Sequence, residues 1–257
     1  TGADAKFGIP VDEVGDAARS ALDHGMRVVG VHAHTGSGLF DEDIEAHRTV
    51  VETLASVASG LEAMGAIDLE FVDIGGGFGV PYRPSESPLD LDGIAASTRD
   101  ALAGLEVELV IEPGRYLVAD AGVLLAAVNT VKESGDGYLA GVDAGMTDLL
   151  RPALYDAYHD VRSLGADAGT SGSRPDAHVS VVGPICESTD VLARDRSLPR
   201  PRRGDLLAVG NAGAYGIEMA SHYNSRPRPP VVALEDGETR VIRRRETIDD
   251  VVAAEVD

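Results

Sequence analysis

The stretch GVHAHTGSGL, residues 30–39, places two histidines and a Gly/Ser turn directly after a short apolar run. The run, at residues 28–31, is typical of a strand that is buried on both faces. Glycine lets a backbone close tightly around a small ligand. The stretch therefore predicts a strand that ends at a ligand.

Strands and helices alternate through the first half of the chain. Such βα units require a parallel sheet, because each helix carries the chain back to the start of the next strand. The pattern closes with a further predicted helix over residues 119–131. The segments before it are a helical stripe at 14–22, a strand at 27–32, a helical stripe at 51–61, a strand at 69–75, a helix at 92–103 and a strand at 107–113.

The second half has a different pattern, with short apolar runs bounded by Gly and Pro. Such runs indicate a mainly β region. The segment GADAGTSGSRPD at 165–176 is predicted to be an exposed loop. The predicted strands are YLAGVDAG at 138–145, HVSVVGP at 178–184, DLLAVGN at 205–211 and a hairpin at 231–244.

The composition is that of a globular protein with an acidic surface. Its 257 residues are 44% apolar, and 43 acidic residues face 22 basic ones, giving a net charge of −21. This charge argues against nucleic acids and anionic membranes as partners, because both would be repelled. Two explanations stay open: a salt-rich cytoplasm whose ions screen the carboxylates, or an ordinary acidic protein from an organism that favours Arg over Lys.

No apolar stretch approaches the ~20 residues of a membrane span, and the first residues lack the regions of a signal peptide. We therefore expect a cytoplasmic protein. The single cysteine, Cys186, excludes an internal disulfide and a thiolate zinc site, and no metal is expected. Taken alone, such a cysteine is most often a small buried apolar residue.

Each predicted strand of the first half ends in a polar or glycine-rich turn, at residues 34–38, 75–79 and 112–115. Ligands of parallel α/β folds lie at the carboxyl ends of the strands. One glycine turn is a weak sign of phosphate binding, but a second Gly/Ser turn and an arginine accompany it here. Together the three turns predict one ligand site.

Six motifs occur in one order across most of the chain: HAHTGSG, DIGGGFG, IEPGRY, VDAGMTDLLRPALYDAYH, GPICESTD and GNAGAYG. In this order they resemble the pyridoxal-phosphate (PLP) dependent decarboxylases of the alanine-racemase-like barrel fold, and among them most resemble the diaminopimelate decarboxylases. The resemblance implies an α/β fold. Residues 1–130 would form the C-terminal part of a PLP-binding (β/α)8 barrel, and residues 131–257 a mainly β domain with substrate-binding and partner-subunit residues.

The resemblance implies a PLP site in the first domain. His34 resembles the family histidine that stacks on the cofactor ring and holds its orientation. His32 lies on the same face of the strand, where a supporting role is one of two open readings. The phosphate-binding groups implied by the resemblance are Ser37, the backbone N–H groups of Gly75, Gly76 and Gly77, and the Tyr215 hydroxyl.

Glu112 resembles the glutamate that pairs with the pyridine nitrogen and keeps it protonated, so that the ring can accept electrons. Arg115 would lie near the phosphate and the substrate, because its donors suit either oxyanion. The alternative for these two residues is a structural ion pair. The catalytic residues implied by the resemblance are His34, Glu112 and Cys186.

Arg151 and Tyr155 of RPALY resemble the residues that bind the distal carboxylate of diaminopimelate, which suits a bidentate arginine. Cys186 and Glu187 of CES resemble residues that reach into the partner subunit's active site. There the cysteine would donate a proton and the glutamate would face the distal amino group. The resemblance thus implies a homodimer with shared active sites, and it adds to the substrate-binding set Arg115 and Tyr215.

One family feature has no counterpart in the sequence. Members begin with a small β segment and the first barrel strands, one of which carries the lysine that forms the Schiff base with PLP. Residues 27–112 supply only about the last three strands of the barrel, and neither Lys6 nor Lys132 matches that lysine. We therefore expect a fragment, a truncated gene product or one piece of a split enzyme, without activity alone.

For the complete protein the resemblance implies a carboxy-lyase that converts meso-diaminopimelate, a small amino-acid substrate, to lysine with PLP as cofactor. One alternative is a related decarboxylase of another basic amino acid or a carboxylated polyamine. The other is an inactive fragment or PLP-binding homologue.

Overall fold

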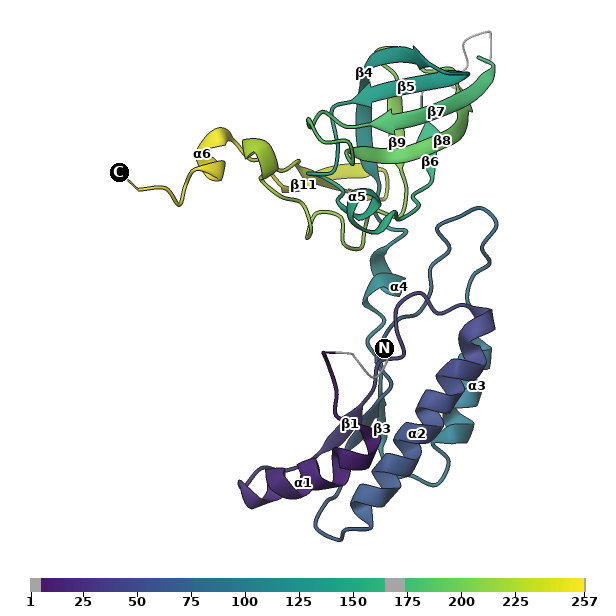
Figure 1. Ribbon diagram of the computed structural model, residues 1–257, viewed down its shortest axis with the longest axis vertical. Coiled ribbons are helices and arrows are strands. Elements are labelled where there is room, and N and C mark those ends of the chain that lie inside the picture. Colours follow the sequence, from purple (N-terminus) through teal and green to yellow (C-terminus); the bar gives the residue numbers. More distant parts are fainter. Residues whose placement is uncertain (1–5, 165–173, 257) are drawn as a thin grey trace. The chain divides into compact units, whose positions relative to one another are not determined.

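The computed structural model describes residues 6–164 and 174–256. They form two compact units, which we describe separately (Figure 1). The first unit comprises the chain up to Pro81 together with Ser87–Leu117, and the second comprises Tyr82–Glu86 and the chain from Val118 onward. Most of the predicted loop at 165–176 lies outside the described residues.

The first unit is built on a parallel sheet in the order β1-β2-β3. Gly30 pairs with Phe71, and Phe71 pairs with Glu108, so the three strands start in register. This alternation of helices and parallel strands confirms the predicted α/β fold. The elements are 3-10 helix η1 (Val11–Glu13), α1 (Val14–Asp23), β1 (Gly30–His32), η2 (Asp41–Asp43), α2 (Ile44–Glu62), β2 (Phe71–Asp73), α3 (Leu91–Ala101), β3 (Glu108–Val110) and α4 (Gly114–Val118), the last residue of which lies in the second unit.

The core of the first unit lies between the sheet and its helices. The predicted apolar stripe of α2 is buried at Val51, Leu54, Ala58 and Leu61, and it packs with Val72 of β2. The run at 28–31, in contrast, is only half-buried. The prediction of a strand buried on both faces is therefore wrong for the described residues, since the buried cluster covers the sheet from the side of α2.

His47 of α2 is a buried polar residue in this unit. It is 1% exposed, and neither ring nitrogen has a hydrogen-bond partner among residues 6–164 and 174–256. Burial lowers the pKa of the His47 imidazole below its ordinary value of 6.5, because a charged ring would lose its hydration. The folded chain thus holds His47 neutral under conditions where an unfolded chain binds a proton.

We expect the free energy of unfolding to fall as the pH drops below about 6.5, because the unfolded chain then gains a proton at His47 that the folded chain excludes. The loss stops growing below the folded pKa. Replacing His47 by Leu should reduce the difference in stability between about pH 8 and about pH 5.5, as measured by urea denaturation. The control is His24→Gln at an exposed site, which should keep the wild-type difference in the free energy of unfolding between the two pH values. If His47→Leu kept that difference as well, the assignment of the pH dependence to His47 would be wrong.

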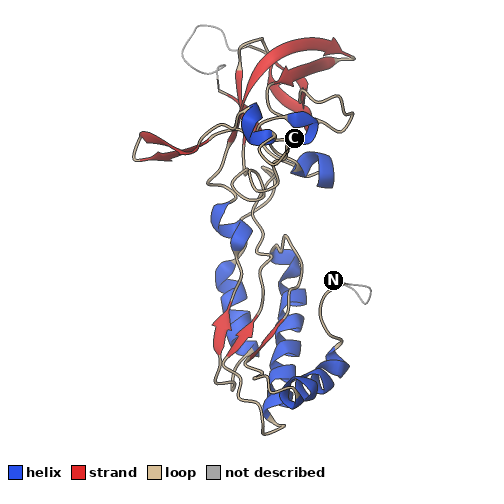
Figure 2. Cartoon of the chain, turned by 90° about the vertical axis from the view of Figure 1, so that its left-hand side faces the viewer, coloured by secondary structure: helices blue, strands red, loops and turns tan. Residues whose placement is uncertain are grey.

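The second unit holds a mixed six-stranded sheet in the order β6-β9-β4-β5-β7-β8 and a separate hairpin, β10-β11 (Figure 2). The mainly β character predicted for this half is confirmed. The elements are β4 (Leu124–Ser134), β5 (Gly137–Val142), α5 (Arg151–Tyr155), β6 (Val161–Ser163), β7 (Asp176–Val182), β8 (Val191–Pro199), β9 (Leu206–Val209), η3 (Tyr223–Ser225), β10 (Val231–Glu235), β11 (Glu238–Arg243) and α6 (Ile248–Val251).

The helix predicted over residues 119–131 is wrong, because Leu124–Ser134 form strand β4. The run LLAA favours a helix by local propensity. Tertiary pairing overrides it: β4 pairs antiparallel with β5 on one side and with β9 on the other. Ala126 and Val128 point into the core, with the period of two that a strand requires.

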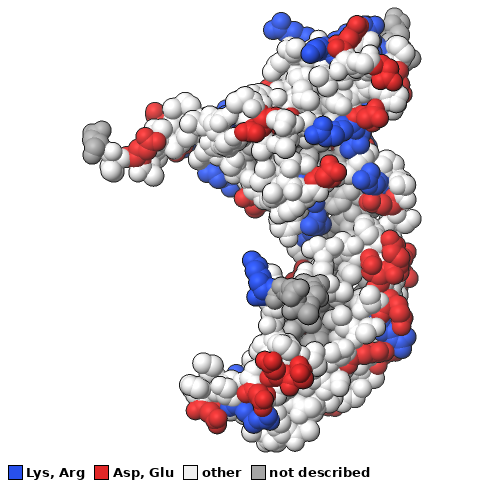
Figure 3. Space-filling model, viewed as in Figure 1, with Lys and Arg blue, Asp and Glu red and all other residues white. Residues whose placement is uncertain are grey.

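Acidic side chains are spread over the visible surface of both units (Figure 3). Several form local ion pairs, such as Glu52 with Arg48 on α2 at 2.9 Å and Asp160 with Arg162 at 2.8 Å. Exposed pairs of this kind contribute little to stability. Within the described part of the chain, no helix is both long enough and apolar enough to cross a bilayer.

Candidate functional site

The turns that follow β1, β2 and β3 hydrogen-bond to one another through their main chains. The N–H groups of Gly38 and Leu39 donate to the Gly77 carbonyl at 3.0 and 2.8 Å. The Glu112 N–H donates to the Gly75 carbonyl at 2.9 Å. The structure therefore brings the three turns together at the carboxyl ends of the strands.

Close backbone approach explains the glycines of the turn that follows β2, called the middle turn below. A Cβ atom on Gly76 would collide with the carbonyl oxygen of Glu112, and one on Gly77 with that of Gly36. Gly77 also has a φ of +91°, a left-handed conformation that side chains disfavour. These glycines therefore let the three turns close on one another.

The N–H groups of the middle turn differ in what they bind. Gly75 donates to the Asp73 carboxylate at 2.8 Å, and Gly76 donates to Nδ1 of His34 at 3.3 Å. The Gly77 N–H has no partner within the described ranges. Of the three backbone N–H groups predicted to bind phosphate, that of Gly77 is the one that these contacts leave for a ligand. Ser37, in the turn after β1, is exposed.

The contact with Gly76 also indicates which nitrogen of a neutral His34 ring carries the proton. Because Nδ1 accepts the Gly76 N–H, a neutral His34 ring carries its proton on Nε2. The ring is exposed at the end of the first strand. It is thus held by one edge and open to a flat ligand.

Glu112 lies beside His32. The Glu112 Oε2 atom is 3.3 Å from Nε2 of His32, and both side chains are about half exposed. His32 therefore contacts and orients Glu112, which favours its supporting role. Arg115 is half-buried on the first turn of α4.

Asp73 is a residue of this candidate site that sequence reasoning missed. It is 9% exposed, and its carboxylate holds the glycine turn through Gly75. Ligand atoms of Asp73, His32 and Glu112 lie within 4.8 Å of one another, so a cation could bind here. The signal was the Asp placed directly before IGGG, where a carboxylate can cap the turn.

The second unit contains the other predicted residues. Arg151 begins α5 and is 7% exposed, whereas Tyr155, one turn later on the same helix, is 64% exposed. Tyr215 is 47% exposed and has a φ of +57°. A left-handed tyrosine stores backbone strain, which is typical of ligand-binding positions.

Cys186 and Glu187 lie on an exposed loop between β7 and β8. Cys186 is thus not the small buried residue that a lone cysteine usually is. Its Sγ atom is 3.7 Å from Nδ2 of Asn224. The Tyr223 hydroxyl donates a hydrogen bond to the Glu187 carboxylate, and this bond raises the pKa of Tyr223.

A buried carboxylate fixes this loop. Asp190 is 2% exposed and accepts the N–H groups of Ile185 at 2.7 Å and Met146 at 2.6 Å. Gly145 and Gly183 pack so closely on Asp190 that a Cβ on either would collide with its carboxylate. Asp190 therefore ties the residue before Cys186 to a second loop.

Replacing Asp190 by Asn should lower the free energy of unfolding by about 1–3 kcal/mol, because the amide nitrogen would face a buried N–H that the carboxylate now accepts. Urea denaturation measures this loss. The matched control is Asp195→Asn, an exposed carboxylate on β8 that should cost at most about 0.5 kcal/mol. Equal losses in the two variants would contradict the role of Asp190.

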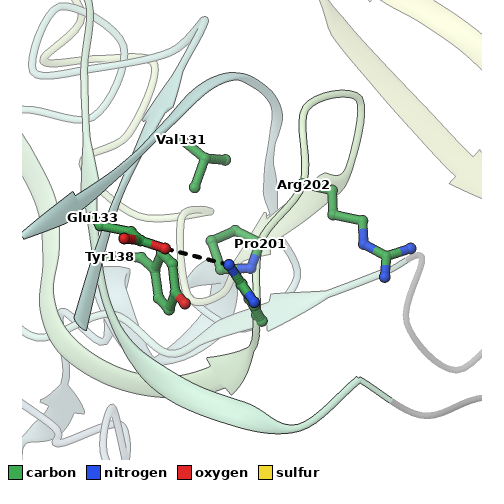
Figure 4. Close-up of a pocket in the computed structure, with 6 residues that line it drawn as sticks. Val131, Glu133, Tyr138, Pro201 and Arg202 are labelled. Atoms are coloured by element: carbon green, nitrogen blue, oxygen red, sulfur yellow. Dashed lines mark hydrogen bonds and ion pairs between the residues drawn. The ribbon is translucent and has the colours of Figure 1, made fainter. Parts of the chain in front are cut away.

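An open cavity of about 480 Å³ lies elsewhere in the second unit (Figure 4). Arg200 pairs with Glu133 at 3.4 Å across it and lies 4.9 Å above the Tyr138 ring. None of the predicted site residues lines this cavity. Its lining residues are Val131, Glu133, Tyr138, Arg200, Pro201 and Arg202.

Two family models match consecutive parts of the chain. Residues 1–119 match the pyridoxal binding domain of the pyridoxal-dependent decarboxylases, and residues 115–213 match their C-terminal sheet domain. The chain belongs to the pyridoxal-dependent decarboxylase family. Its two structural units, divided near residue 117, follow these two family domains.

Within this family, the chain is similar to diaminopimelate decarboxylases. The chain is 45% identical to the diaminopimelate decarboxylase of Methanothermobacter thermautotrophicus over 96% of its own length and 58% of the relative's. It resembles the structure of diaminopimelate decarboxylase from Helicobacter pylori in complex with L-lysine, with a TM-score of 0.89, 39% identity and coverage of 98% of this chain and 61% of that one.

A lysine/ornithine decarboxylase from Vibrio vulnificus, solved with cadaverine, is also similar. Its TM-score is 0.76 and its identity 26%, over 87% of this chain and 58% of that one. The family fold is therefore common to both kinds of decarboxylase, while sequence identity is higher to the diaminopimelate enzymes. The chain spans about three fifths of the length of these relatives.

Proposed function

We propose that the natural protein is a carboxy-lyase that converts meso-diaminopimelate to lysine with PLP. The observation that carries this proposal is the 45% identity to a diaminopimelate decarboxylase over 96% of the chain, which includes the buried arginine of RPALY. Lysine/ornithine decarboxylases act on substrates without a distal carboxylate, so an arginine at this position favours diaminopimelate.

The residues of the first unit fit PLP. An exposed imidazole at His34 can stack on the ring, and a half-exposed carboxylate at Glu112 can bind a protonated pyridine nitrogen. The Gly77 N–H and the Ser37 hydroxyl are donors for a phosphate at the end of a parallel sheet. We assign further contacts to Arg115 and Tyr215. Bound PLP supplies an electron sink for the bond that breaks.

The chain's own residues then have separate tasks. Glu112 keeps a proton on the pyridine nitrogen, and His32 holds the Glu112 carboxylate in place at 3.3 Å. We assign Cys186 as the proton donor to the reacting carbon, since its thiol is exposed on a fixed loop. Glu187, oriented by Tyr223, faces the distal amino group.

Arg151 and Tyr155 bind the distal carboxylate. One carboxylate leaves as carbon dioxide and the distal one stays, so the product lysine keeps the group that Arg151 recognises. A relative that binds L-lysine supports this assignment. The affinity for lysine therefore measures recognition of the distal carboxylate without requiring the decarboxylation reaction.

We propose that the natural protein is a homodimer in which Cys186 and Glu187 complete the partner's site, and that it works in the cytoplasm. The exposure of both side chains on one loop supports the first proposal. The predicted domain boundary at residue 130 stays a prediction.

The direct test of the function is release of carbon dioxide from the substrate. The natural protein loaded with PLP should convert meso-diaminopimelate to lysine, with lysine and ornithine as poor substrates. Release from lysine or ornithine at the same rate would identify a different decarboxylase, and release from none of the three would overturn the proposal.

A further inference from the structure

His159, which the sequence analysis did not single out, is fully buried beside Arg151. Helix α5 ends in a turn at Asp156, which adopts a left-handed conformation with a φ of +51°. This turn brings residues eight positions apart into contact. Nε2 of His159 lies 2.9 Å from Nη1 of Arg151.

The contacts of His159 define which ring nitrogen carries the proton. The Arg151 guanidinium has donors only, so Nε2 of His159 must be the acceptor in this hydrogen bond. Nδ1 then carries the proton and donates it to the Gly210 carbonyl at 2.8 Å. The imidazole is therefore neutral and fixed at both nitrogens.

Tyr82 completes the arrangement. The Arg151 guanidinium lies 4.8 Å from the centre of the Tyr82 ring, and the His159 ring meets Tyr82 edge-on at 5.3 Å. The guanidinium is thus held in its plane by a hydrogen bond and over an aromatic face by cation–π attraction. A long arginine side chain would otherwise sample many rotamers.

We propose that His159 is a positioning residue for recognition of the distal carboxylate, acting through Arg151. The proposal rests on the proposed function, since it assigns Arg151 to that carboxylate. By accepting one guanidinium N–H from a fixed point, His159 sets the direction of the planar donor fork. Recognition of a carboxylate by two parallel hydrogen bonds depends on that direction. His159 is thus a specificity residue that touches no substrate atom.

Two substitutions separate the two contacts of His159. In His159→Asn the shorter amide can reach the Gly210 carbonyl in place of Nδ1, but it is too short to replace Nε2 as the acceptor for Nη1 of Arg151. In His159→Gln the longer side chain can place an amide oxygen where Nε2 was, so the contact with Arg151 survives. The control is His178→Asn, the same change at an exposed histidine of β7.

The measurement is calorimetric binding of L-lysine and of cadaverine to the PLP-loaded natural protein and its variants. Cadaverine is lysine without the carboxylate. We expect His159→Asn to weaken L-lysine by about 10-fold or more, with cadaverine changed by less than about threefold. His159→Gln should recover most of the lysine affinity, and KM for diaminopimelate should rise more than kcat falls.

Parallel losses for lysine and cadaverine, or lysine affinity in His159→Asn equal to that of His178→Asn, would overturn the inference. Comparable losses in His159→Asn and His159→Gln would show a structural role only. The proposed function fails separately: a wild-type protein that does not prefer L-lysine to cadaverine would refute the assignment of Arg151, and with it that of His159, before any variant is compared.

Discussion

Glu112→Gln is expected to lower kcat for diaminopimelate by about 100-fold or more while PLP stays bound. The carboxylate of Glu112 would accept a hydrogen bond from the N–H of a protonated pyridine ring, whereas the amide N–H of Gln can donate to an unprotonated ring nitrogen. The cofactor would then keep its place and lose its capacity as an electron sink. Steady-state rates and the absorbance of bound PLP, measured on the same sample, separate the two effects.

The control for this experiment is Glu108→Gln, which removes the same charge from an exposed position on β3. It should leave kcat within about threefold of the wild-type value. Glu112→Gln rates within a few fold of wild type would refute the role of Glu112. Loss of bound PLP in Glu112→Gln would instead show that this carboxylate anchors the cofactor.

The sequence predicted those parts of the site that depend on short runs of neighbouring residues. Strands that end in glycine turns at 34–38, 75–79 and 112–115 must meet when the strands are parallel, and the main chains of these turns do hydrogen-bond to one another. The burial of a side chain and the pairing of a strand depend on residues that are distant in the sequence. The run LLAA in β4 favours a helix by local propensity, and it forms a strand because β4 pairs with β5 and β9.

The residues that sequence reasoning missed share one property: each acts on the backbone or on another side chain. Asp73 caps a turn, Asp190 joins two loops and His159 holds a guanidinium. Their hydrogen-bond partners lie between two and 51 positions away in the chain, and spacing alone does not indicate them. All three lie within the six motifs, but the resemblance implies roles only for residues expected to contact a ligand.

Arg151→Ala is expected to weaken binding of L-lysine to the natural protein by about 30-fold or more, since it removes a buried charged donor from a carboxylate. Cadaverine, which has no carboxylate, should bind with nearly wild-type affinity. Binding of both compounds by calorimetry gives the comparison. KM for diaminopimelate should rise in the same proportion as the dissociation constant of L-lysine.

Because Arg151 also packs on Tyr82 and pairs with His159, its truncation removes a contact from each, and thermal unfolding must accompany the binding data. Arg151→Lys keeps the charge and most of the volume but lacks the planar fork, so it should also lose lysine affinity while it stays folded. The control is Arg162→Lys, the same change at an exposed arginine paired with Asp160. Two outcomes would contradict the role of Arg151: equal L-lysine affinity in Arg151→Lys and Arg162→Lys, or equal losses of L-lysine and cadaverine affinity in Arg151→Ala. In either case Arg151 would be structural, and another residue would bind the distal carboxylate.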